Sequence, residues 1–74
     1  MRGIIVRIPT DRHTGERKGF LFVKGEDGVE RFVHRSGLSD DAGSFEHLKV
    51  RDRVEFEPEE GAKGPRASAV RLLI

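Results

Sequence analysis

The residues best suited to a chemical role lie at positions 18–24, which read Lys-Gly-Phe-Leu-Phe-Val-Lys. Side chains alternate along a β-strand, so Phe20 and Phe22 share one face with the two flanking lysines. Leu21 and Val23 share the other face. Because an unpaired ammonium group is rarely buried, we expect the aliphatic face to form the core and the Phe face to meet water. Exposed aromatic rings between cations are typical of a surface on which unpaired bases stack while phosphates contact the cations.

A second strand, beginning at Glu30 and ending at His34, is predicted to complete this face. The intervening Gly-Glu-Asp-Gly sequence is typical of a turn. A five-residue connection over 25–29 sets up four opposed pairs: Lys24 with Glu30, Phe22 with Phe32, Phe20 with His34, and Leu21 with Val33. A four-residue connection would turn Phe32 and His34 toward the core. We favour the five-residue connection because it pairs aromatic rings and opposite charges on one face.

Three further segments are predicted to be strands. Residues 1–8 are rich in β-branched side chains and end at Pro9, which cannot donate to a sheet ladder. Residues 50–57 alternate, with Val54 and Phe56 pointing inward. Residues 67–74 form a last short strand with apolar side chains at Val70, Leu72 and Ile74.

The connections are rich in glycine, proline and polar residues. We expect a mobile surface loop at 10–17, a loop with one helical turn at 36–45, and turns at 58–65. Five short strands joined in this way predict an all-β fold, a small five-stranded antiparallel barrel.

The composition of the chain excludes several classes of function. The chain has 74 residues, so residues 1–74 are expected to form one domain, and the apolar ending leaves open that this is the N-terminal domain of a longer chain. With no cysteine, and no metal-ligand spacing among the histidines, no metal or cofactor is expected. No catalytic motif or membrane-length apolar run is present, so we predict a cytoplasmic protein that is not an enzyme and does not contact membranes. A net charge of +1 excludes a strongly basic electrostatic binder but leaves room for a locally basic face.

Several segments resemble the cold-shock domain family. Residues 18–23 resemble its first ribonucleoprotein motif, usually Lys-Gly-Phe-Gly-Phe-Ile, and residues 31–36 resemble the second, usually Val-Phe-Val-His, an aromatic residue and Ser. Phe45 and Leu48, followed by Val54 and Phe56, are similar to later family segments, and residues 61–67 are similar to its Gly-x-Lys/Arg-Gly-Pro-x-Ala turn. The resemblance implies an OB-type barrel that binds single-stranded RNA or DNA without a cofactor and acts as an RNA chaperone.

The chain also departs from the family pattern. Where the first strand of the family has Lys-Trp-Phe, this chain has Val6-Arg7-Ile8, and the aromatic residue after the histidine is Arg35. Two stacking surfaces are therefore replaced by guanidinium groups, which can themselves stack on bases.

Together these patterns predict a monomer that binds single-stranded nucleic acid with little sequence specificity and has no small-molecule substrate. Bases would stack on Phe20, Phe22, Phe32 and His34, with Phe45 added by the resemblance. The predicted phosphate or base contacts are Lys18, Lys24, Lys63, Arg7 and Arg35. The alternative is a protein-interaction barrel that has lost most nucleic-acid binding, which the missing first-strand aromatics and the low net charge favour.

Overall fold

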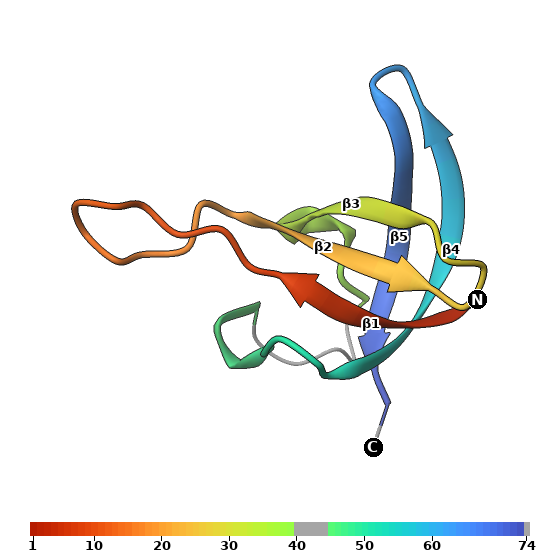
Figure 1. Ribbon diagram of the computed structural model, residues 1–74, viewed down its shortest axis with the longest axis horizontal. Helices are drawn as coiled ribbons and strands as arrows, with labels where there is room; N and C mark the ends of the chain where they lie inside the picture. The colour runs from red at the N-terminus through yellow and green to blue at the C-terminus, as the bar shows by residue number, and fades with distance from the viewer. Residues whose placement is uncertain (40–44, 74) are drawn as a thin grey trace.

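Five strands close into a barrel in the order β1-β2-β3-β5-β4 (Figure 1). The structure, a computed structural model, describes residues 1–39 and 45–73. The strands and the two short 3-10 turns are β1 (Arg2–Arg7), β2 (Phe20–Gly25), β3 (Glu30–His34), η1 (Arg35–Gly37), η2 (Phe45–His47), β4 (Arg53–Gly61) and β5 (Gly64–Leu72). The predicted all-β, five-stranded barrel is confirmed.

One pair of neighbouring strands, β3 and β5, runs parallel, and the other four pairs are antiparallel. A closed ring with an odd number of strands cannot alternate direction at every step. The predicted antiparallel barrel therefore includes one parallel pair. Phe32 of β3 lies opposite Arg66 of β5 there.

The β2–β3 hairpin has the predicted five-residue connection. All four predicted pairs are observed: Phe20 with His34, Leu21 with Val33, Phe22 with Phe32, and Lys24 with Glu30. In the turn, the amide of Gly28 donates to the carbonyl of Gly25 over 2.9 Å, and Gly28 has a φ of 81°, which favours glycine. This register places all the Phe side chains of the hairpin on one face.

The core lies inside the barrel and is made of aliphatic residues and two phenylalanines. The buried apolar residues are Ile5, Leu21, Val23, Val33, Phe45, Leu48, Val54, Phe56, Ala67 and Val70. The inward assignments of Leu21, Val23, Val33, Val54 and Phe56 are confirmed. The outer face of β2 and β3 is consequently left with aromatic side chains.

The β4–β5 hairpin is longer than predicted and projects beyond the rest of the barrel (Figure 1). The expected turn-rich segment 58–65 is mostly strand, and Pro58 pairs with Ala67 of β5. On its other side, β4 pairs with β1 only as far as Glu55, so Pro58 lies where β4 is an edge strand. A proline is tolerated on such an edge. A bulge near Ala69, which has a φ of 51°, breaks the alternation. Leu72 is 36% exposed although it lies opposite the buried Val54, and Ile74 lies outside the described residues.

The loop expected at 10–17 is a hairpin-like extension of the barrel. A β-bridge joins Thr10 to Arg17, and the Asp11 carboxylate accepts hydrogen bonds from the amides of His13 and Thr14. The predicted loop at 36–45 contains the last two residues of η1 and the first residue of η2, and its residues 40–44 are outside the described part. No helix among the described residues is long and apolar enough to cross a membrane.

Candidate nucleic-acid interface

Three phenylalanine rings cluster on the outer face of β2 and β3. The ring centroids of Phe20 and Phe32 are 5.4 Å apart, those of Phe20 and Phe22 are 5.9 Å apart, and those of Phe22 and Phe32 are 6.0 Å apart. All three side chains are half-buried, so each has part of its ring open to solvent. We call Phe20, Phe22 and Phe32 the aromatic platform. Its area is apolar and its arrangement suits stacking of flat ligands.

His34 lies next to this platform, opposite Phe20. The backbone amide of Ser36 donates to Nδ1 of His34 over 3.1 Å, and the Ser36 hydroxyl lies 2.8 Å from the same nitrogen. Because a backbone N–H can only donate, Nδ1 carries no proton in this arrangement, and the neutral ring holds its proton on Nε2. The exposed ring therefore offers one defined hydrogen-bond donor beside the platform.

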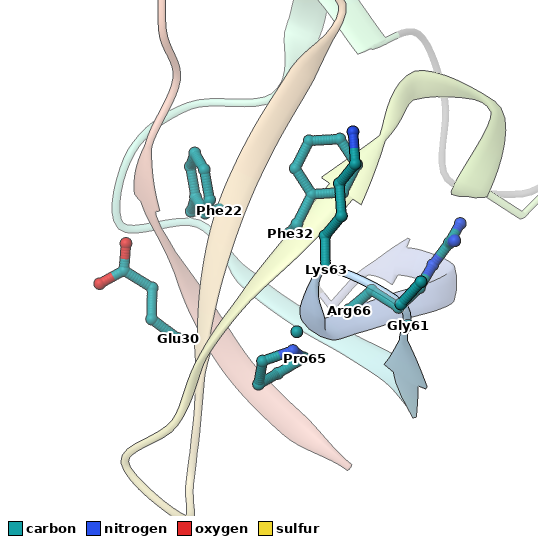
Figure 2. Close-up of a pocket in the computed structure, with 9 residues that line it drawn as sticks. Phe22, Glu30, Phe32, Gly61, Lys63, Pro65 and Arg66 are labelled. Carbon is teal, nitrogen blue, oxygen red and sulfur yellow. The ribbon is translucent and has the colours of Figure 1, made fainter.

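A groove runs from the platform to the β4–β5 turn (Figure 2). It is lined by Phe22, Glu30, Phe32, Gly61, Ala62, Lys63, Gly64, Pro65 and Arg66. In Figure 2 the Lys63 side chain rises beside the Phe32 ring, while Glu30 lies on the other side of Phe22. The groove thus has an aromatic floor between a cationic and an acidic side chain.

The predicted lysines are exposed but come from three different places. Lys18 precedes β2, Lys24 lies near the end of β2, and Lys63 lies in the β4–β5 turn. The predicted strand at 18–24 is shorter at its start, because Gly19 has a φ of 91° and β2 begins at Phe20. Lys18 therefore does not share a strand face with the phenylalanines as predicted, although it lies two residues before Phe20 in the sequence.

Arg66 is a groove residue that the sequence reasoning missed. It lies opposite Phe32 in the parallel β3–β5 pair, and its Nε is 3.8 Å from Glu59 Oε1. The signal was in the sequence, since Ala67 points into the core and its neighbour in the strand must point out.

Arg7 lies on the platform. Its guanidinium carbon is 4.4 Å from the centroid of the Phe22 ring, and Nη2 forms an ion pair of 2.7 Å with Oε1 of Glu30. The sequence predicted that Glu30 would face Lys24, and the register is as predicted. Among the described residues, however, the Glu30 carboxylate forms its ion pair with Arg7.

Phe45 differs from the other predicted stacking residues. Its side chain is 6% exposed and belongs to the core. The guanidinium carbons of Arg17 and Arg35 lie 5.8 and 5.7 Å from its ring centroid, and Arg17 Nη1 donates to the Phe45 carbonyl over 2.6 Å. In this conformation no open ring face is available for a base, so Phe45 is corrected to a core position. The exposed Arg35 covers part of it.

A bidentate ion pair lies away from the platform, at the turn of the β2–β3 hairpin. Arg31, which is 8% exposed, donates from Nη1 and Nη2 to the two carboxylate oxygens of Asp27 over 3.0 and 2.7 Å. These hydrogen bonds, helped by one from the amide of Val29, lower the pKa of Asp27 to about 2. Among the described residues no group of three His, Asp or Glu side chains is placed to hold a metal ion.

Comparison with known proteins gives one family. Residues 13–73 match the model of the 'cold-shock' DNA-binding domain. Cold shock protein 2 of Lactiplantibacillus plantarum is 42% identical over 53 residues, which is 72% of this chain and 77% of the relative. Cold shock-like protein CspE of Escherichia coli (strain K12) is 46% identical over 59 residues, covering 78% of this chain and 83% of the relative. Cold shock-like protein of Thermotoga maritima is 39% identical over 57 residues, covering 77% and 83%.

Proposed function

This chain belongs to the cold-shock DNA-binding domain family, and we propose that it binds single-stranded RNA or DNA by stacking unpaired bases on the aromatic platform. The family binds nucleic acids and is not enzymatic. The observation that carries the proposal is the cluster of three half-buried phenylalanines on an outer barrel face, with ring centroids 5.4 to 6.0 Å apart. A small domain with an aliphatic core gains little from leaving three such rings in water unless they bind something.

The groove explains how a strand could be held. Bases would lie on Phe22 and Phe32, and phosphates would contact cations along the edges, among them Lys63 and Arg66. Lys18 and Lys24 are exposed near the two ends of β2 and would serve the same purpose there. Stacking contributes ~1–3 kcal/mol per base and is tolerant of sequence, because every base has a π-face.

Low sequence specificity follows from the small number of groups that could read a base edge. His34 supplies one donor through Nε2. Most of the remaining surface offers ring faces and exposed cations, which do not distinguish bases. Holding bases unpaired shifts RNA away from intramolecular pairing, and this is the chaperone activity that we propose. It needs no cofactor and no nucleotide hydrolysis.

The first test compares a single strand with the corresponding duplex. We expect a fluorescein-labelled oligothymidine, long enough to form a stable duplex with its complement, to raise its anisotropy on titration with the protein. The duplex formed with its complement should bind much more weakly, since pairing hides the base faces. Equal affinity for both forms would contradict stacking. A label is needed because the chain has no Trp or Tyr.

The same titration separates the second candidate, a protein-interaction barrel. The observation that favours this candidate is the Arg7–Glu30 ion pair, which neutralises a cation where the family has an aromatic residue. If no labelled strand of RNA or DNA bound at low salt, the platform would have to serve a protein partner instead.

A further inference from the structure

A β-bulge determines the direction of Arg7. In the β1–β2 pair, Ile5 lies opposite Val23, but the next pair is Arg7 with Phe22, so β1 has one extra residue at Val6. Without the bulge, Arg7 would point to the same side as the buried Ile5. Bulges re-aim side chains in this way. Arg7 consequently shares the outer face with Phe22.

The guanidinium group is then fixed on two sides. Its carbon lies 4.4 Å from the Phe22 ring centroid, and its Nε and Nη2 both donate to Oε1 of Glu30, over 3.1 and 2.7 Å. Glu30 reaches this point from β3, on the side of Phe22 away from Lys63 (Figure 2). The Arg7 side chain is still 63% exposed. One side of the guanidinium therefore covers the ring, and much of the rest faces solvent.

We propose that Glu30 positions Arg7 over Phe22 as an additional stacking surface, on which an unpaired base lies, and that it removes Arg7 from the set of phosphate contacts. This inference rests on the proposed function. Arg7 would touch the base, and Glu30 would be a positioning residue that acts through Arg7.

The chemistry supports this division of roles. A guanidinium is planar and weakly hydrated, and it stacks on aromatic rings and on bases. A cation that neutralises a phosphate releases condensed counterions and steepens the salt dependence of binding by about 0.7 on a log–log scale. The Arg7–Glu30 pair has no net charge, so it attracts a phosphate less than an unpaired guanidinium would. Its contribution should thus be almost independent of salt.

The experiment measures oligothymidine binding by anisotropy over a salt series for three proteins. The first is the wild type. The second, Arg7→Ala with Glu30→Gln, removes the guanidinium but preserves the net charge of the face. We expect its affinity to fall on the order of 5-fold at every salt concentration, with an unchanged slope. The third, Glu30→Gln alone, leaves Arg7 unpaired, and we expect a slope steeper by about 0.7 and tighter binding at low salt.

A matched control removes another Arg–Glu pair, Arg71→Ala with Glu55→Gln, from β5 and β4 outside the groove. It should change neither affinity nor slope, and circular dichroism melts check that each variant folds. The inference is overturned if the charge-preserving variant binds as tightly as the wild type, or if its slope flattens by about 0.7. If the wild type itself bound no single strand, the proposed function would fail, and this inference with it.

Discussion

Phenylalanines of this chain lie on different sides of the barrel wall, and under the proposed function this difference separates binding from stability. Phe22 lies on the outer face with its ring half-buried, beside Arg7. Phe56 points inward and is 2% exposed. The two residues are alike in chemistry and both lie in strands, so they form a natural pair for testing the assignment of faces.

Phe22→Ala should weaken binding of a labelled single strand by ~1–3 kcal/mol, because it removes a stacking surface, and it should leave the melting temperature nearly unchanged. Phe56→Ala should do the reverse. It leaves a cavity in the core and should cost ~3–5 kcal/mol of folding free energy. The measurements are anisotropy titrations and thermal melts on the same preparations. Melts that showed equal damage from both substitutions would refute the assignment.

Single residues also mark the limit of what the sequence could predict. The outward direction of Phe20, Phe22 and Phe32 followed from alternation and the flanking lysines. The burial of Phe45 did not, because it lies in a 3-10 turn, where no alternation holds, and depends on Arg17 and Arg35 packing over it. The direction of Arg7 depends on a bulge, which has no signature in this sequence.

Among the elements, the β2–β3 hairpin is the most fully predicted. Turn glycines, opposed aromatic rings and opposed charges all specify the same register, and the register is observed. The β4–β5 hairpin was predicted less well. Pro58 and two glycines indicated a long turn, but a proline on an edge and a bulge at Ala69 let both strands continue. Where such edge strands end depends on tertiary pairing, which the local sequence pattern does not specify.

The β2–β3 turn should make folding stability depend on acid. The hydrogen bonds from Arg31 hold the pKa of Asp27 at about 2, below its usual 3.8. A carboxylate with a lowered pKa in the folded state stabilises the fold above its unfolded pKa. That stabilisation should decline as the pH falls below about 4 and should be lost as the pH passes through about 2.

The test compares the wild type with Asp27→Asn in thermal melts at several pH values. The wild type should melt higher near about pH 6, and the difference should shrink toward about pH 2, where its carboxyl group becomes neutral. A difference that stayed constant across this range would mean that Asp27 acts through its shape and not through its charge.

At the level of the whole molecule, the barrel consists of two locally connected parts. One is the β1–β2–β3 meander and the other is the β4–β5 hairpin. They meet where β1 pairs with β4 and where β3 pairs with β5. The number of strands could be predicted, since every barrel strand carries an apolar inner face, and the OB-type closure was implied by the resemblance to the cold-shock domain family. The parallel pairing follows from the odd number of strands and was missed.

The candidate groove crosses one of these joins. Phe22, Glu30 and Phe32 come from the meander, whereas the residues from Gly61 to Arg66 come from the β4–β5 hairpin. A strand lying in the groove would therefore touch both parts. The two contacts that close the barrel also link segments far apart in the chain, so they form at a high cost in loop entropy.

This arrangement gives a bound strand a kinetic effect. Separation of the meander from the hairpin opens the β3–β5 join, and a ligand that bridges the join must dissociate first. Stopped-flow circular dichroism can follow unfolding and refolding in denaturant. The unfolding rate should fall as oligothymidine is added. The refolding rate should stay the same if the groove forms only after the folding transition state. Refolding that accelerated with ligand while unfolding stayed constant would mean that the groove assembles before the barrier. Nucleic acid would thus lengthen the lifetime of the folded barrel that holds it.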